Sequence, residues 1–130
     1  MKILHLSTAN ITLAVRIWGD NNTLAPTLIM VHGFPDNSLV WQTIAEQLSK
    51  VFRVVAYDVR GAGDSSIPKA TSAYKIRYLV DDLAAVIDAV SPSQAVHLIG
   101  HDWGAIQCWE AVTTPRLAGR IASFTSISGP

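Results

Sequence analysis

One aspartate stands in a sequence pattern that typically presents a catalytic nucleophile. The pentapeptide Gly100–Gly104 (GHDWG) has the form Gly-x-nucleophile-x-Gly and follows the apolar run Val96–Ile99. A sharp turn between a strand and a helix pushes the central side chain outward, and the two glycines relieve the crowding that this turn creates. Asp102 is therefore a candidate nucleophile.

The type of nucleophile decides which reactions are possible. A carboxylate can displace a leaving group from a saturated carbon, which gives an ester with the enzyme that water can then hydrolyse. A serine hydroxyl that attacked the same carbon would leave an ether, which is not cleaved at a useful rate. Asp102 thus indicates alkyl transfer followed by hydrolysis. The alternative is that Asp102 only caps the helix that follows, because aspartate is a preferred N-cap residue.

A second motif could supply the hydrogen-bond donors for the hydrolytic step. The segment His32–Pro35 follows the apolar run Leu28–Val31. We predict that the backbone N–H of Phe34 and that of Trp103, at the positive end of a predicted helix, bind the oxyanion that forms as the ester is hydrolysed. Phe34, Pro35 and Trp103 are also predicted to contact the substrate. A plain Gly-Pro turn is the alternative interpretation of this segment.

A histidine base and an acid are also needed for ester hydrolysis, and the sequence does not supply them clearly. His5 falls in a predicted hairpin and His97 within a predicted strand. His32 and His101 fall in the two motif loops, where packing and backbone hydrogen bonds are the ordinary roles of histidine. The residues alone therefore predict only part of a catalytic site.

The other acidic residues indicate structure rather than chemistry. Asp58–Ser65 is expected to be a structural turn after a strand, in which Arg60 pairs with a nearby acid. Three acids of a predicted helix are expected on its solvated face, namely Asp81, Asp82 and Asp88. We predict no metal and no cofactor.

The apolar pattern predicts the strands that would position the two motifs. Alternating apolar residues over Ile11–Ile17 predict a half-buried strand, paired with Ile3–Leu6 in an antiparallel hairpin. Continuous apolar runs predict parallel strands covered on both faces: Leu28–Val31, Val54–Tyr57, Val96–Ile99 and Ile121–Phe124. The fold class is therefore α/β, a three-layer arrangement around a mostly parallel sheet. Both motifs lie at the carboxyl ends of its strands, where ligands bind in such sheets.

Three helices with apolar faces are predicted between these strands. The first presents Trp41, Ile44, Ala45 and Leu48, and the second presents Leu79, Leu83, Val86, Ile87 and Val90. The third begins near Trp103, ends before Pro115 and is predicted to turn Ile106, Trp109 and Val112 inward.

Composition excludes several classes of function. The chain has 130 residues, 49% of them hydrophobic, which is enough for about one folded domain. Ten basic residues balance ten acidic ones without any basic run, so we predict neither a nucleic-acid nor a membrane partner. No apolar stretch approaches the roughly 18 residues that span a bilayer, and no export signal is visible. The single cysteine, Cys108, suits a reducing compartment, so a cytoplasmic location is predicted.

The two motifs, HGFPD at residues 32–36 and GHDWG at residues 100–104, resemble those of the α/β-hydrolase superfamily in its epoxide hydrolase and haloalkane dehalogenase branches. The resemblance implies an eight-stranded sheet with the nucleophile after strand 5, of which this sequence supplies what resemble strands 1 to 6. Residues 1–130 are thus expected to form a partial α/β-hydrolase domain without a cap. The histidine base, the acid and the cap tyrosines would lie beyond Pro130, in a continuation or a fused domain.

Within the superfamily, the resemblance favours an epoxide hydrolase with a small apolar substrate. Dehalogenases commonly carry Asn where this chain has Phe34, whose side chain cannot donate a hydrogen bond to a halide. A haloalkane dehalogenase and a catalytically inactive truncated fragment remain the alternatives. Residues 66–74 and 122–130 are also similar to those of actinobacterial epoxide hydrolases fused to a short-chain dehydrogenase.

Overall fold

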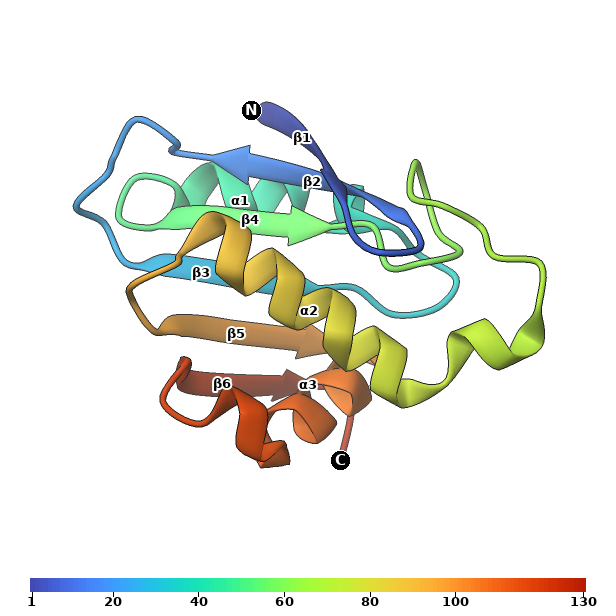
Figure 1. Cartoon of the computed structure of the whole chain (residues 1–130). Helices are drawn as coiled ribbons and strands as arrows, with labels where there is room; N and C mark the ends of the chain where they lie inside the picture. The colour runs from blue at the N-terminus through green and yellow to red at the C-terminus, as the bar shows by residue number, and fades with distance from the viewer.

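The fold is built around one mixed six-stranded sheet, described for residues 1–130 by a computed structural model. The strand order is β1-β2-β4-β3-β5-β6 (Figure 1). The strands are β1 (Lys2–Ser7), β2 (Thr12–Trp18), β3 (Thr27–Val31), β4 (Arg53–Tyr57), β5 (Val96–His101) and β6 (Ile121–Ile127). Strands β1 and β2 form an antiparallel hairpin, β2 pairs antiparallel with β4, and β3 to β6 run parallel. The predicted mostly parallel sheet with an N-terminal antiparallel hairpin is confirmed.

Helices cover both faces of the sheet, with α2 and α3 on one face and α1 on the other (Figure 1). The α-helices are α1 (Gln42–Leu48), α2 (Ile76–Val90) and α3 (Trp103–Thr113). Short 3-10 turns accompany them, η1 (Ser38–Trp41), η2 (Thr71–Tyr74) and η3 (Pro115–Leu117). None of these helices is both long enough and apolar enough to cross a membrane.

Two apolar clusters, one on each face, hold the layers together. The larger joins the sheet to α2 and α3 and contains 19 buried residues, including Leu83, Val86 and Ile87 of α2. This confirms the predicted apolar face of that helix. The smaller cluster has 7 buried residues and joins the other face to Trp41 and Ala45. Burial of this apolar surface is the main contribution to the stability of the fold.

The prediction for the inward face of α3 holds only for Val112, which packs against the larger cluster, and is wrong for Trp109. The buried residues of α3 are Gly104, Ala105, Gln107, Cys108 and Ala111, whereas Trp109 is 43% exposed and Ile106 and Val112 are only partly buried. The reason is the close approach of the helix to the sheet. A Cβ on Gly104 would overlap the Val31 carbonyl oxygen and would lie 2.6 Å from that of His32. A side chain does not fit at Gly104, where α3 lies closest to β3.

Two smaller expectations also differ from the structure. Ile44 is exposed, because Trp41 belongs to the preceding 3-10 turn and α1 therefore presents only Ala45 fully to the core. The run Ile121–Phe124 is not covered on both faces: β6 pairs only with β5, lies at the edge of the sheet and has alternating exposure. A strand with one neighbour and few covering residues cannot be buried like β3.

Candidate functional site

Asp102 occupies a strained backbone position between β5 and α3. Its φ of 56° and ψ of −124° lie in a region that residues other than glycine rarely adopt. Such a conformation costs about 1–3 kcal/mol and persists only where the surroundings enforce it. Although Asp102 holds the N-cap position of α3, its side chain makes no capping hydrogen bond. The turn therefore does not use the carboxylate to close the helix.

The carboxylate of Asp102 instead faces the loop that follows β3. The backbone N–H of Phe34 donates to Oδ2 of Asp102 over 3.1 Å. The backbone N–H groups of Trp103 and Phe34 favour the charged carboxylate and hold the pKa of Asp102 below its ordinary value. Asp102 is therefore charged at neutral pH, which is the form that acts as a nucleophile. The structure thus brings together Asp102, Phe34 and Trp103 as the sequence predicted.

Glycine at position 33 permits this close approach. A Cβ on Gly33 would lie 2.6 Å from both Cβ and Oδ2 of Asp102, and 2.9 Å from the carbonyl oxygen of His101. Any side chain here would push the two motif loops apart. The contact between the two loops therefore requires glycine at position 33, in addition to any requirement of the turn. With a side chain there, the Phe34 N–H could not come within hydrogen-bond distance of Asp102.

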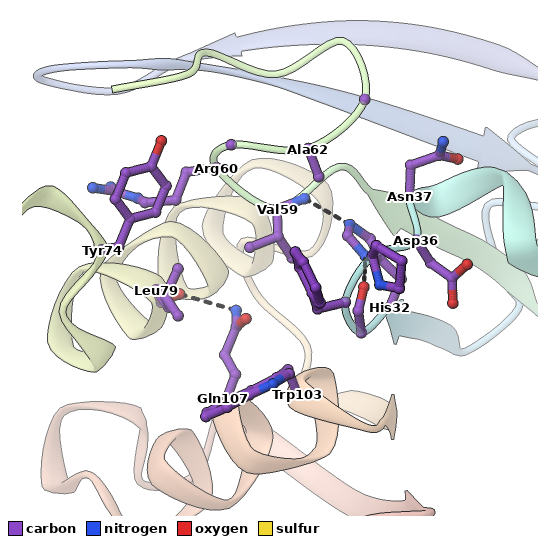
Figure 2. A pocket seen from close by; sticks show the side chains of 15 residues that line it. His32, Asp36, Asn37, Val59, Arg60, Ala62, Tyr74, Leu79, Trp103 and Gln107 are labelled. Atoms are coloured by element: carbon purple, nitrogen blue, oxygen red, sulfur yellow. Dashed lines mark hydrogen bonds between the residues drawn. The ribbon is translucent and has the colours of Figure 1, made fainter. Parts of the chain in front are cut away.

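A cavity of about 640 Å³ opens beside the two motif loops (Figure 2). Phe34, Pro35 and Trp103 line it, and the side chains of Phe34 and Trp103 are 78% and 60% exposed. These are the three residues predicted to contact a substrate. Asp102 is not itself a lining residue, but its carboxylate contacts the N–H of Phe34 and its neighbour in sequence is Trp103, and both of these residues line the cavity. The arrangement gives an apolar ligand an aromatic surface directly beside a charged carboxylate.

Sequence reasoning missed the remaining walls of this cavity. They are formed by the loop after β4, residues 59–63, and by Tyr74, Leu79 and Gln107, while His32, Gly33, Asp36 and Asn37 complete the lining from the loop after β3. Gln107 extends from α3 towards Leu79 of α2 (Figure 2), donates to the Leu79 carbonyl over 3.1 Å and also donates to the hydroxyl of Tyr57. The loop after β4 could have been found, because β3 and β4 are neighbours and end at the same edge of the sheet.

A buried carboxylate, Asp58, organises the loops behind the cavity. It accepts hydrogen bonds from the N–H and the hydroxyl of Ser38 (2.8 and 2.6 Å), from the N–H of Asp64 (2.8 Å) and from Nη1 of Arg16 (2.9 Å). Burial by itself raises the pKa of Asp58, but the hydrogen bonds from these three residues outweigh burial and lower the pKa overall. The turn Asp58–Ser65 is thus organised by a buried charge at its start, and residues 59–63 of the same turn also line the cavity, which the prediction of a purely structural turn did not include.

The expectation that Asp82 lies on a solvated face is wrong. Asp82 is buried, and its two carboxylate oxygens accept from Nε and Nη2 of Arg60, both over 2.7 Å. Asp82 turns inward because Arg60, from the loop after β4, reaches over α2 at this point. Asp81 and Asp88 are exposed, as predicted. The acid that pairs with Arg60 is therefore 22 residues away in sequence rather than in the same turn.

None of the four histidines hydrogen-bonds to Asp102. His32 is buried and bridges the Gly33 carbonyl (2.8 Å) and the Val59 N–H (2.9 Å). His101 lies edge-on to Trp41, and His97 contacts the Ser123 hydroxyl. His5 belongs to β1. The chain thus brings a carboxylate and two donors together without a histidine base in contact with them.

The environment of His32 predicts a pH-dependent stability. Val59 N–H can only donate, so Nε2 must accept and the ring is neutral with its proton on Nδ1. Burial lowers the pKa of His32 below 6.5, although the Gly33 carbonyl, Asp58 and Asp36 act in the opposite direction. Below pH 6.5 the unfolded chain therefore binds more protons at this residue than the folded chain. We expect the free energy of unfolding to fall as pH drops below 6.5.

Urea denaturation at several pH values from 5 to 8 measures this effect. The change should be smaller in His32→Asn, which cannot titrate in this range, than in the original chain. An identical pH dependence in both proteins would contradict the assignment.

Comparison with known proteins finds relatives of the chain in sequence and in structure. A family described as the alpha/beta hydrolase fold matches residues 26–130. The chain is 44% identical over 116 residues to the probable oxidoreductase EphD of Mycobacterium tuberculosis, covering 89% of the chain and 20% of that protein. It is 41% identical over 108 residues to epoxide hydrolase A of the same organism, covering 82% of the chain and 32% of that protein.

Solved structures agree with these sequence matches. The crystal structure of epoxide hydrolase VrEH1 from Vigna radiata matches with a TM-score of 0.90 and 32% identity, covering 99% of this chain and 40% of that one. Epoxide hydrolase A from Mycobacterium thermoresistibile matches with a TM-score of 0.86 and 30% identity, covering 96% and 38%. The chain thus spans from a fifth to two fifths of the length of these relatives.

Proposed function

Because the chain belongs to the alpha/beta hydrolase fold family, we propose that it carries the nucleophile of an epoxide-opening hydrolase, and that this nucleophile is Asp102. The observation that supports this most is the position of the Asp102 carboxylate. It is charged, it stands on a strained turn beside an open cavity, and the Phe34 N–H donates to it over 3.1 Å. Relatives named epoxide hydrolases match most of the chain, which suggests the type of electrophile.

In the proposed first step, a carboxylate oxygen attacks a ring carbon of the epoxide. Phe34 holds Oδ2, so Oδ1 is the oxygen assigned to the attack. A bond forms between Oδ1 and the carbon, the ring carbon–oxygen bond breaks, and the ring oxygen takes a proton from water. The product is a hydroxyalkyl ester of Asp102. Phe34 and Trp103, which line the cavity, would contact the apolar part of the epoxide.

In the proposed second step, water attacks the carbonyl carbon of this ester. Negative charge then develops on Oδ2, where the Phe34 N–H already points, with the Trp103 N–H at the start of α3 as the second donor. Donors arranged before the reaction stabilise such an oxyanion without reorganisation. Loss of one donor of this kind typically slows the reaction by about 10²–10³-fold.

The hydrolytic step needs a base, and this requirement shapes what the chain does by itself. No histidine of the chain hydrogen-bonds to Asp102, and His32 already uses both ring nitrogens. Without a base to activate water, an ester formed on Asp102 would persist. The proposed activity of the 130-residue chain is therefore one-time covalent capture of an epoxide rather than turnover.

The side chain of Phe34 favours an epoxide over a haloalkane. A haloalkane would leave a halide, to which the indole N–H of Trp103 could donate, but the side chain of Phe34 adds no second donor. The relative EphD is named a probable oxidoreductase, and this chain covers only a fifth of it. The glycine loop after β4 is also unsuited to the phosphate of a nucleotide, because the Asp58 carboxylate fills the space beside Gly63 and would repel a phosphate.

We propose the cytoplasm as the location, since Cys108 is buried and unpaired.

Covalent capture can be measured directly on this chain. After incubation with a terminal aryl epoxide such as styrene oxide, we expect the intact mass of the chain to increase by one epoxide. Asp102→Asn should abolish the increase, because an amide is a poor nucleophile at a saturated carbon. The rate is followed by mass spectrometry over time at pH 7.

Asp88→Asn is the matched control for this experiment. The side chain of Asp88 is 73% exposed, lies near the end of α2 and pairs with Arg120 rather than with a residue of the motif loops. If exposure alone caused alkylation, Asp88 would react readily and its replacement would reduce the mass increase. Capture that continues in Asp88→Asn and stops in Asp102→Asn supports the proposal. Equal capture in the original chain and in Asp102→Asn would refute it.

A further inference from the structure

We propose that His32 is a positioning residue that aims the Phe34 N–H at Asp102. The inference rests on the proposed role of Asp102. It adds a role for His32, whose ring nitrogens contact backbone groups and not the carboxylate of Asp102. Packing and ordinary backbone hydrogen bonding would explain the burial of His32. They would not explain why its two ring nitrogens bind the Gly33 carbonyl and the Val59 N–H in particular.

A single peptide group, the one between Gly33 and Phe34, connects His32 to Asp102. Its carbonyl accepts a hydrogen bond from Nδ1 of His32 over 2.8 Å, and its N–H donates to Oδ2 of Asp102 over 3.1 Å. A peptide group is planar, and in the trans form its carbonyl and N–H point in opposite directions. Fixing the carbonyl towards His32 therefore fixes the N–H towards Asp102.

The imidazole can act as a fixed reference because it is itself held on both sides. Its Nε2 accepts from the Val59 N–H over 2.9 Å, and only 3% of the residue is exposed. Val59 follows Asp58, whose carboxylate is fixed by Arg16, Ser38 and Asp64. The ring thus connects the loop after β4 to the loop after β3 (Figure 2).

The flexibility of Gly33 makes the hydrogen bond from His32 necessary. Its contact with Asp102 excludes any side chain, and a residue without Cβ has the greatest backbone freedom. The carbonyl of Gly33 also accepts from the Asp36 N–H over 3.1 Å, which closes the turn of residues 33–36. That bond holds the turn together internally. His32 is the group that ties this carbonyl to the neighbouring loop.

Two substitutions separate the two hydrogen bonds of His32. Asparagine places an amide nitrogen near the position of Nδ1 and can still donate to the Gly33 carbonyl. Glutamine places its terminal amide near the position of Nε2 and can serve only the Val59 N–H. A purely structural role would make the two variants differ only through their overall stability, which urea denaturation measures.

The readout is the amide proton shift of Phe34 in a nitrogen-15 NMR spectrum of the 130-residue chain at neutral pH. Asp102→Asn gives the shift of a Phe34 N–H that no longer points at a carboxylate. We expect His32→Gln to move the Phe34 resonance in the same direction as Asp102→Asn, and His32→Asn to leave it near its original position. The pKa of Asp102, followed by carbon-13 NMR, should rise towards 3.8 in His32→Gln and stay lower in His32→Asn.

Equal shifts in the two His32 variants would overturn the inference, as would an unchanged Phe34 resonance in both. If the variants fail to fold, the nitrogen-15 shifts of the His32 ring in the original chain decide the question, because a proton on Nε2 instead of Nδ1 would overturn it. These NMR readouts do not depend on capture of an epoxide. Failure of capture with the expected Phe34 shifts would reject only the proposed function, and capture without those shifts would reject only the role of His32.

Discussion

Asp58→Asn is expected to destabilise the chain by about 3–5 kcal/mol, which is the usual cost of removing one partner of a buried ion pair. The substitution keeps the volume of the side chain but removes the charge that Arg16 faces. The carboxylate of Asp58 accepts four hydrogen bonds on two oxygens, whereas an asparagine amide has only one acceptor oxygen. Its NH₂ group would then face one of the donors from Ser38, Asp64 or Arg16, which would lose its acceptor. Chemical denaturation measures the difference in the free energy of unfolding.

Asp64→Asn provides the comparison for this prediction. Asp64 also pairs with Arg16, through Nη2 over 2.8 Å, but its side chain is 70% exposed. An exposed pair of this kind contributes about 0–1 kcal/mol. Similar losses in the two variants would show that burial of Asp58 does not determine its contribution to stability, and would contradict this prediction.

Gly104→Ala is expected to have the second largest effect on stability. The added Cβ would overlap the carbonyl oxygen of Val31 and lie 2.6 Å from that of His32. Both obstacles are backbone atoms of a central strand and its end, so neither can rotate away. We expect a loss of about 3 kcal/mol or more, at the upper end of what overpacking costs. The movement of α3 should also displace Trp103 and reduce capture of an epoxide.

The control is Gly119→Ala, where an added Cβ meets no atom within 4 Å. Gly119 has a φ of 77°, so this change carries only the cost of a positive φ, about 1 kcal/mol. Thermal or urea denaturation of both variants tests the contrast. A loss in Gly104→Ala no greater than in Gly119→Ala would show that α3 does not pack against β3 as closely as described.

The contact between the two motif loops could be predicted because it follows from general rules of parallel sheets. Phe34 and Asp102 are 68 residues apart, yet they follow β3 and β5, which are neighbours in the sheet. The carboxyl ends of neighbouring parallel strands meet at one edge, so motifs placed after them lie close together. Apolar runs located the strands, and the glycine spacing identified Asp102.

Features that depend on distant partners could not be predicted in the same way. Apart from Gln107, the inward face of α3 consists of small residues, which give no strong hydrophobic periodicity, whereas Trp109 is apolar but exposed. Asp82 looks like a surface acid until the loop after β4 brings Arg60 to it. The pairing of Gln107 with Tyr57 joins residues 50 apart in sequence. In each case the deciding contact exists only in the folded chain.

Locating the alkylated residue is the measurement that tests the central claim most directly. The chain is treated with styrene oxide, digested, and the peptide that contains Asp102 is sequenced by tandem mass spectrometry. The account predicts a single hydroxyalkyl ester on Asp102. An adduct found on a histidine, on Cys108 or on another carboxylate, with Asp102 unmodified, would contradict it.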